Sequence, residues 1–295
     1  MEEITIKARA KINLALDISG KREDGYHEIS TVMQTLSLFD TLEIKKIYKP
    51  NYGVKLVSNV GWLPVDEKNL VYKVATYLKE AFAIDTGVFI NLTKVIPTSA
   101  GLGGGSADCA ATLVAMRDLF DLPLTNQDLE ELGAKFGADV PFCVSGGTAH
   151  ATGFGELLKP ISQPPFAHVL LVKPPTIVST EEIFGDFSMD KINQRPDIDK
   201  IISCIDQGDL EGMCREMGNV LETVTIPKYP ELDEIKKALI KQGAMGAMMS
   251  GSGSTIFGIF KRRTQMEQAA EFIKSSFTHI NEIFLTKFEP RRNLK

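Results

Sequence analysis

The sequence predicts an α+β protein organised as two domains, on three observations. The chain has 295 residues, a length that suits one large or two ordinary domains. Alternating apolar residues run through positions 4–18, as in half-buried strands, and helical spacing takes over between 66 and 136. Residues 168–288 then mix short helices with strands, the order of an α+β protein.

The N-terminal residues predict a series of strands. Residues 4–10 and 11–18 alternate apolar with polar side chains, which places Lys11 and Asn13 on one polar face. That pattern alone is typical of a solvent-exposed face. Further strands are expected at 29–38, 41–47 and 54–57, with a turn at Phe39-Asp40 between the first two.

A polar loop, 19–29, separates the first strands and ends in Tyr26 and His27. Such a loop can be a plain connection between two strands. A tyrosine next to a histidine near a loop tip seldom serves a core. We therefore expect substrate contact at this pair.

Residues 66–82 predict a helix, because Leu70, Val74, Leu78 and Phe82 recur every four residues. Asp66 is a candidate N-cap for this helix. A strand at 88–93 and a helix over 107–120 are expected next.

The stretch Pro97 to Asp108 lies between that strand and that helix, and four of the five residues 101–105 are glycine. Without Cβ atoms, backbone N–H groups can approach a ligand closely, and the first N–H groups of a helix have no internal partner. The helix dipole also favours negative charge there. The loop therefore predicts phosphate binding. It is not the Walker pattern, because Ser106 follows the last glycine and no lysine stands there.

Asp139 is a lone acid in an apolar neighbourhood that follows the next predicted helix. That helix begins with a capping box at Thr125 to Asp128 and is expected to stop at Gly137. Pro141 should push Val140 out of the helical region and turn the chain sharply. Two interpretations of Asp139 stay open here: a cap, or a partly desolvated functional carboxylate beside a cation.

The second half predicts alternating elements and a second small-residue loop. Residues 250–255 read as a tight hairpin turn between two strands. The proline-bearing connector at 160–165 is expected to divide the chain into domains 1–160 and 161–295. The strands are expected at 168–172, 244–249, 256–260 and 280–288, and the helices from 179, over 198–217, 230–240 and 266–277.

Composition excludes several classes of protein. The net charge is −5 with no basic block, which argues against a nucleic-acid partner. No apolar run is long enough to cross a membrane, and the N-terminus lacks the pattern of a signal peptide. The four cysteines are far apart and form no C-x-x-C, so neither a disulfide framework nor a zinc site is expected. A cytoplasmic setting is expected, and the oligomeric state, a homodimer included, stays open.

Three stretches together resemble the GHMP kinase superfamily of small-molecule kinases. The glycine loop at 97–107 is similar to its ATP phosphate-binding motif, the strand at Lys11 to its N-terminal motif, and the loop at 250–255 to its C-terminal motif. The resemblance spans nearly the whole chain. It implies a nucleotide-binding N-terminal domain like domain 2 of ribosomal protein S5, and a ferredoxin-like C-terminal domain, meeting at a cleft.

The resemblance also implies ATP with Mg²⁺ as cofactors, and two catalytic residues. Asp139 would act as the general base, with Lys11 as its cationic partner. Ser106 is the expected protein contact of the metal, and no other metal ligand is assigned. The implied ATP-binding residues are Asn69, Leu70, Lys94, Pro97, Ser99, Ala100, Gly101, Leu102, Gly103, Gly104, Gly105, Ser106 and Ala107.

Shorter motifs at 10–14, 24–27 and 138–142 resemble superfamily members that phosphorylate a tertiary hydroxyl of a cytidine diphosphate-linked polyol in isoprenoid precursor synthesis. The resemblance implies that Tyr26 and Phe184 stack on the cytosine and that His27 reads its edge. The implied substrate-binding residues are Asn13, Tyr26, His27, Asp139, Thr180 and Phe184.

Two alternatives remain. A homoserine or mevalonate type of GHMP kinase has an acyclic acceptor and needs no base-stacking slot, so Tyr26, His27 and Phe184 argue against it. A non-catalytic ligand sensor could dispense with the base, so intact Lys11 and Asp139 argue against that alternative.

Overall fold

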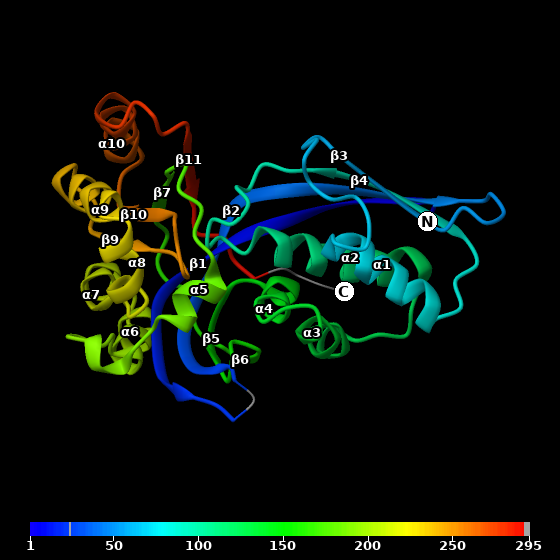
Figure 1. Cartoon of the computed structure of the whole chain (residues 1–295), viewed down its shortest axis with the longest axis horizontal. Coiled ribbons are helices and arrows are strands. Elements are labelled where there is room, and N and C mark those ends of the chain that lie inside the picture. Colours follow the sequence, from blue (N-terminus) through cyan, green and yellow to red (C-terminus); the bar gives the residue numbers. More distant parts are fainter. Residues whose placement is uncertain (24, 292–295) are drawn as a thin grey trace.

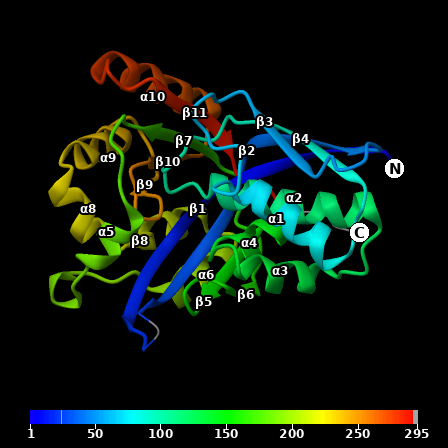
Figure 2. The ribbon, with the colours of Figure 1, turned by 45° about the vertical axis from the view of Figure 1, so that its right-hand side comes forward.

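A computed structural model describes residues 1–23 and 25–291 of the chain. Asp24, the first residue of the motif at 24–27, lies outside the described residues. The chain folds into two sheets with helices packed on them, and two long, curved strands, β1 and β2, run alongside both halves (Figure 1). The view in Figure 2 shows these two strands reaching beyond the helices to a hairpin tip.

The first sheet has seven strands in the part of the chain that the structure describes. Its main order is β3-β4-β2-β1-β8, while β5 pairs with β2 and β6 pairs with β5. β1 and β2 form an antiparallel hairpin from Glu3↔Lys45 to Lys21↔His27, with three register shifts that bend it. The strands are β1 (Glu3–Lys21), β2 (His27–Ile47), β3 (Val54–Ser58), β4 (Gly87–Thr93), β5 (Thr148–Thr152), β6 (Leu157–Pro160) and β8 (Gly218–Asn219).

Among the described residues, this half of the molecule has four helices, and two of them supply most of its core. The apolar face of α1 and nearly all of α2 pack against the inner residues of β2 and β4, with Leu42, Ile44 and Ile90 fully buried. The helices are α1 (Leu70–Ala81), α2 (Gly104–Phe120), α3 (Asn126–Ala134) and α4 (Val140–Ser145).

Two predictions about helix starts were wrong. The N-cap of α1 is Asn69, whose Oδ1 accepts the Val71 N–H at 2.9 Å, and Asp66 instead accepts the Lys68 N–H in the preceding turn. The chain does not leave the helical region at Val140, because α4 begins there with Pro141 in its first turn. Proline is tolerated at that place, since its missing N–H would have no partner anyway. The capping box at Thr125 is confirmed.

The predicted turn at Phe39-Asp40 was also wrong, because β2 runs straight through it. A register shift relative to β1 falls between Thr35 and Phe39 instead. The Asp40 side chain is fully buried and accepts the backbone N–H groups of Val95 and Ile96. A polar residue that satisfies buried donors from another segment looks, in sequence, like a turn residue.

The second sheet is four-stranded and antiparallel, in the order β11-β7-β10-β9. Along the chain, the first strand of this sheet is followed by helices, a hairpin of two strands, a further helix and the final strand. The first and third of these strands lie in the centre of the sheet. This is the ferredoxin-like arrangement expected. Its strands are β7 (His168–Lys173), β9 (Gly246–Met249), β10 (Ile256–Phe260) and β11 (Glu282–Lys287).

Most helices of this half lie at the outer end of the molecule, away from α1 and α2 (Figure 1). The single helical stretch expected at 198–217 is two helices, and α8 had no counterpart in the expected elements. They are α5 (Thr180–Gly185), a 3₁₀ turn η1 (Met189–Lys191), α6 (Ile198–Asp206), α7 (Leu210–Glu216), α8 (Glu222–Lys228), α9 (Glu231–Lys241) and α10 (Arg263–Ser276).

The two halves share buried surface. One apolar cluster joins Ile12, Leu14 and Leu36 of the β1–β2 hairpin to Val169 and Phe257 of the second sheet. β8 also pairs with Ala15 and Leu16 of β1. The division of the chain at residue 160 stays a prediction.

Candidate active site

A cleft of about 930 Å³ gathers almost every predicted site residue. Its walls are the glycine loop, β1, the start of α4, helix α5 and the tip of the β1–β2 hairpin. All the predicted ATP-binding, catalytic and substrate-binding residues line it except Ala107, which belongs to α2 and is buried in the core.

The glycine loop leads directly into α2, three residues earlier than expected. The helix begins at Gly104, and its N-cap Gly103 has a left-handed backbone and no side chain to bond the first N–H groups. Gly101 is left-handed as well, with φ of 74°. The residues of this loop line the cleft at the positive end of a helix, the arrangement that binds phosphate.

Close contacts from the second domain hold the glycine loop in shape. The Ser250 hydroxyl donates to the Gly101 carbonyl at 2.9 Å. A Cβ on Gly101 would lie 2.0 Å from the Ser250 carbonyl oxygen. The loop at 250–255 is thus a hairpin turn between β9 and β10, as predicted, and also a support for the glycine loop.

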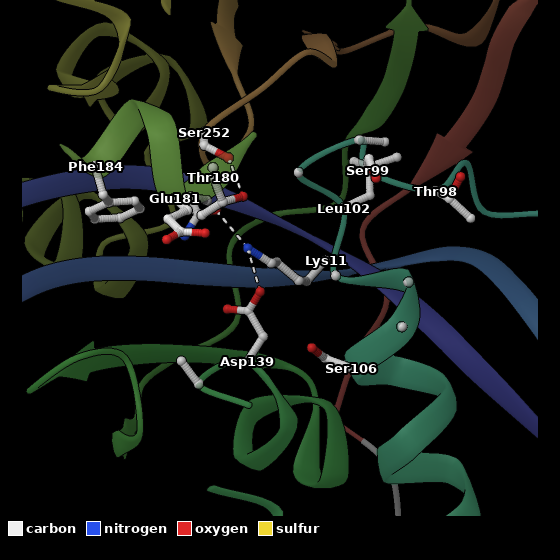
Figure 3. A pocket seen from close by; sticks show the side chains of 18 of the residues that line it. Lys11, Thr98, Ser99, Leu102, Ser106, Asp139, Thr180, Glu181, Phe184 and Ser252 are labelled. Carbon is white, nitrogen blue, oxygen red and sulfur yellow. Dashed lines mark hydrogen bonds and ion pairs between the residues drawn. The ribbon is translucent and has the colours of Figure 1, made fainter. Parts of the chain in front are cut away.

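Both the backbone and the side chain of Lys11 contact the glycine loop. Its backbone N–H donates to the Leu102 carbonyl at 3.0 Å. Its side-chain stem passes beneath Gly103, where a Cβ would lie 2.9 Å from Lys11 Cγ. The ammonium then reaches Asn13 Oδ1 at 3.0 Å and Asp139 Oδ2 at 3.2 Å (Figure 3).

Asp139 sits at the N-cap of α4, but its carboxylate makes no capping hydrogen bond. It points into the cleft toward Lys11 and is 29% exposed, against 5% for the lysine side chain (Figure 3). The Asp139 side chain therefore does not cap the helix, which was the first of the two interpretations. The carboxylate is reachable from the cleft and has a fixed cation on one side.

Aromatic rings gather at the hairpin tip and around α5. Tyr26 packs on Phe154 with ring centroids 5.2 Å apart, and it remains 60% exposed. His27 lies 5.4 Å from the ring of Phe184 and 5.9 Å from that of Phe187. Phe154 and Phe187 were missed from the sequence, since neither stands in a motif and each meets its partner only through folding.

Helix α5 carries the remaining acceptor-side residues. A helix start near residue 179 was expected, and Ser179 is the N-cap of α5. The Thr180 hydroxyl is hydrogen-bonded to Ser252 at 2.8 Å. Burial and the nearby Lys21 charge lower the pKa of His27 below its ordinary value. The imidazole is therefore neutral at physiological pH and offers one donor and one acceptor.

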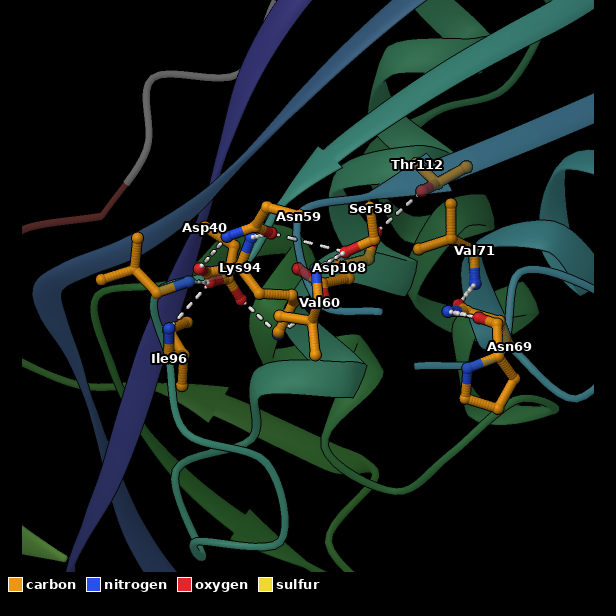
Figure 4. A network of polar contacts seen from close by, with 12 residues as sticks. Asp40, Ser58, Asn59, Val60, Asn69, Val71, Lys94, Ile96, Asp108 and Thr112 are labelled. Carbon is orange, nitrogen blue, oxygen red and sulfur yellow. Dashed lines mark hydrogen bonds and ion pairs between the residues drawn. The ribbon is translucent and has the colours of Figure 1, made fainter. Parts of the chain in front are cut away.

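The opposite end of the cleft contains Asn69, Leu70 and Lys94. The Asn69 side chain caps α1 and also donates to the Pro64 carbonyl at 2.8 Å. Lys94 is buried, and its ammonium contacts the carboxylates of Asp40 and Asp108, the latter at 2.8 Å (Figure 4). Asp108 lines the cleft too, and neither acid was identified as a site residue from the sequence.

These buried charges perturb one another. Burial raises the pKa of Asp108 to about 8; the Lys94 ammonium opposes that rise and Asp40 adds to it. Burial alone would lower the pKa of Lys94, but the two carboxyl groups outweigh it and hold the pKa above its ordinary value.

Within residues 1–23 and 25–291, no three His, Cys, Asp or Glu side chains gather as a metal-binding group. No helix in that part of the chain is long and apolar enough to span a membrane. The four cysteines are free thiols.

Comparisons with known proteins agree with this geometry. Residues 69–147 match the family model of the GHMP kinases N terminal domain, and residues 201–279 match that of the GHMP kinases C terminal domain. A protein of Lachnospira eligens named 4-diphosphocytidyl-2-C-methyl-D-erythritol kinase is 46% identical over 93% of this chain and 94% of its own length. The chain belongs to the GHMP kinase family. It is an ATP-dependent small-molecule kinase.

Further relatives place this GHMP kinase within its family. A protein of Geobacillus thermodenitrificans with the same name is 46% identical over 90% of this chain and 91% of its own length. The kinase therefore groups with the 4-diphosphocytidyl-2-C-methyl-D-erythritol kinases.

Solved structures show how widely the fold is shared. A 4-(cytidine 5'-diphospho)-2C-methyl-D-erythritol kinase matches with a TM-score of 0.81 and 30% identity, over 97% of this chain and 99% of that one. A homoserine kinase from Cytophaga hutchinsonii matches with a TM-score of 0.80 at 21% identity, over 99% and 96% of the two chains. The fold of this kinase therefore does not separate one acceptor from another.

Proposed function

We propose that this kinase transfers the γ-phosphoryl group of ATP to the tertiary 2-hydroxyl of 4-diphosphocytidyl-2-C-methyl-D-erythritol. The observation that carries the proposal is the place of the Lys11–Asp139 pair, between the glycine loop and the aromatic residues of the acceptor end. The names of the relatives support the same acceptor.

ATP lies with its phosphates on the glycine loop and the N-terminus of α2. The left-handed backbone at Gly101 and Gly103 turns N–H groups toward the cleft, and the absence of a side-chain cap leaves them for the ligand. The adenosine occupies the end of the cleft lined by Asn69, Leu70 and Lys94.

Asp139 takes the proton of the acceptor hydroxyl as its oxygen attacks the γ-phosphorus and ADP leaves. An alcohol is a weak nucleophile at neutral pH, so a positioned base contributes. Lys11 orients the carboxylate through their ion pair, and its ammonium stabilises negative charge on the transferring group. Asn13 fixes that ammonium from the other side.

The cytidine end of the acceptor binds at the hairpin tip. Tyr26 offers an exposed ring, and the neutral His27 lies against the ring of Phe184 on α5. Stacking of one base on an aromatic ring contributes roughly 1–3 kcal/mol. Thr180 and Asn13 supply polar contacts to the rest of the acceptor.

Mg²⁺ accompanies ATP in this proposal. The residues fit such an ion, because Mg²⁺ keeps several waters and is usually held by substrate phosphates with one or two protein oxygens. Ser106 lines the cleft in the first turn of α2, where its hydroxyl can supply such an oxygen. When bound, the ion would neutralise charge on the phosphates. We further propose that the enzyme works in the cytoplasm, where free cysteines persist.

The test is ADP release by the purified enzyme with three acceptors offered separately. We expect turnover with 4-diphosphocytidyl-2-C-methyl-D-erythritol and only background rates with homoserine or mevalonate. Turnover with homoserine or mevalonate instead would replace the proposed acceptor. No release with any of them would point to a non-catalytic sensor.

A further inference from the structure

Phe154 lies in the tight turn between β5 and β6, at the acceptor end of the cleft. Its ring packs on that of Tyr26, with centroids 5.2 Å apart and planes inclined at 34°. Aromatic rings at this separation attract one another. Tyr26 also lines the cleft and stays 60% exposed. The Tyr26 ring therefore has an aromatic neighbour from another segment and still has surface left for a ligand.

The turn that carries Phe154 is closed by its own contacts. The Phe154 N–H donates to a Glu156 carboxylate oxygen at 2.7 Å. A Cβ on Gly155 would lie 3.3 Å from Ile29 Cδ1 and 3.7 Å from Ala138 Cβ, so the turn packs between β2 and the start of α4. The Phe154 side chain is half-buried. Its ring is therefore held by a packed turn and not presented on a long loop.

The same turn is joined to the tip of the β1–β2 hairpin. The Ile29 N–H donates to the Gly153 carbonyl at 2.7 Å, and the Gly153 N–H donates to Glu28 Oε1 at 3.2 Å. The other oxygen of Glu28 pairs with Arg22 at 3.2 Å. The Arg22 guanidinium lies 6.0 Å from the centroid of the Phe154 ring. These contacts fix the hairpin tip and the turn relative to each other, so the Phe154 ring has a defined place beside the tip.

We propose that Phe154 is a positioning residue, whose ring holds Tyr26 in the orientation that stacks on the cytosine of the acceptor. The inference rests on the proposed function, which gives Tyr26 that stacking role. A side chain that is ordered before binding loses less conformational freedom when its ligand arrives. Loss of the Phe154 ring should therefore weaken acceptor binding through Tyr26 and leave nucleotide binding unchanged.

The experiment is calorimetric titration of the whole enzyme with Mg-ADP, and then with cytidine diphosphate while Mg-ADP fills the nucleotide site. Phe154→Leu keeps an apolar side chain but removes the ring. Its dissociation constant for cytidine diphosphate should rise about two- to tenfold, the range expected for loss of one aromatic pair, and that for Mg-ADP should not change. Phe154→Met, a second variant without a ring, should behave in the same way, and Phe154→Tyr should bind as the wild type does.

The matched control is Phe166→Leu. This substitution also removes one ring of an aromatic pair, because Phe166 packs on His168 with centroids 4.9 Å apart. Phe166 is not among the described residues that line the cleft. Its loss should leave the affinity for both ligands at the wild-type value.

A double variant separates positioning from direct contact, since Phe154 lines the cleft itself. If Phe154 acts through Tyr26, adding Phe154→Leu to Tyr26→Ala should cause no further loss of affinity for cytidine diphosphate. A further two- to tenfold loss in that background would overturn the inference, as would wild-type affinity in Phe154→Leu. Absence of cytidine diphosphate binding by the wild type would instead contradict the proposed acceptor.

A second readout needs no ligand. In enzyme labelled with fluorotyrosine, the fluorine NMR resonance of Tyr26 is the one that Tyr26→Phe removes. Phe154→Leu should move this resonance toward the position of free fluorotyrosine, because the neighbouring ring is lost, and should leave the other tyrosine resonances in place. A Tyr26 resonance that does not move would overturn the inference.

Discussion

Lys11 and Asp139 form an ion pair of 3.2 Å in the middle of the cleft, although they are 128 positions apart in the sequence. The lysine is nearly buried beneath the glycine loop, and the aspartate stands at the start of a short helix without capping it. The β1–β2 hairpin places the lysine, and α4 places the acid. A base and a cation are thereby fixed between the nucleotide end and the acceptor end.

Gly101→Ala should destabilise the unliganded enzyme. A Cβ there would lie 2.0 Å from the Ser250 carbonyl oxygen, and the left-handed backbone, with φ of 74°, is itself strained for alanine. We expect a clear loss of thermal stability and weaker ADP binding. Gly105→Ala is the control, because no heavy atom lies within 4 Å of its added Cβ and alanine favours a helix. Equal melting temperatures for the two variants would contradict the close packing described for the glycine loop.

Tyr26→Ala should weaken binding of the acceptor much more than binding of ADP. The exposed ring is available for stacking on the cytosine, so the dissociation constant for cytidine diphosphate should rise about 5- to 150-fold, from roughly 1–3 kcal/mol per stacked base. Tyr48→Ala, which removes another exposed tyrosine distant from the cleft lining, serves as the control in the same titrations. Equal losses for both ligands would count against stacking at Tyr26.

Cytidine affinity should be constant from pH 7 to pH 8 and fall only in acid. Burial and Lys21 lower the pKa of His27, so the neutral ring that accepts a hydrogen bond persists until the pH drops below that lowered value. Protonation then replaces the acceptor with a second donor. Titration with cytidine, which carries no phosphate, measures this, and His27→Gln should remove the pH dependence. Tighter binding in acid would reverse the proposed role of the imidazole.

Asp40→Ala should be among the most destabilising substitutions in the chain. It removes the acceptor of two backbone N–H groups and leaves Lys94 beside Asp108 alone, and breaking a buried pair costs about 3–5 kcal/mol. Urea unfolding measures the loss. The control is Glu43→Ala on the same strand, an exposed residue whose carboxylate accepts from the Asn91 amide and should matter little. A loss no larger than that of Glu43→Ala would mean that the contacts of Asp40 with Lys94 and the two backbone N–H groups add nothing to stability.

Much of the cleft could be predicted from the sequence because its walls are local patterns. The glycine loop, the strand at Lys11 and the Tyr26-His27 tip each occupy a continuous stretch, and folding brings all of them to one cleft. Residues whose role depends on distant partners were missed. Asp40 and Asp108 meet Lys94 only in the fold, and Phe154 meets Tyr26 across the hairpin.

Local rules also failed where another rule competed. Pro141 argues against a helix for the residue before it, yet proline is accommodated in the first turn of α4. Asp40 looks like a turn residue in the sequence, because the backbone N–H groups that donate to its carboxylate belong to residues 95 and 96, far along the chain. In both cases tertiary structure decided between two patterns that the sequence allowed.

The central claim is that Asp139 acts as the base toward the cytidyl acceptor. Steady-state ADP release with 4-diphosphocytidyl-2-C-methyl-D-erythritol should show kcat about 10²–10⁴-fold lower in Asp139→Asn than in the wild type. ADP affinity and thermal stability of the variant should stay close to those of the wild type. A kcat within a few-fold of the wild type would contradict the account and remove Asp139 from the mechanism.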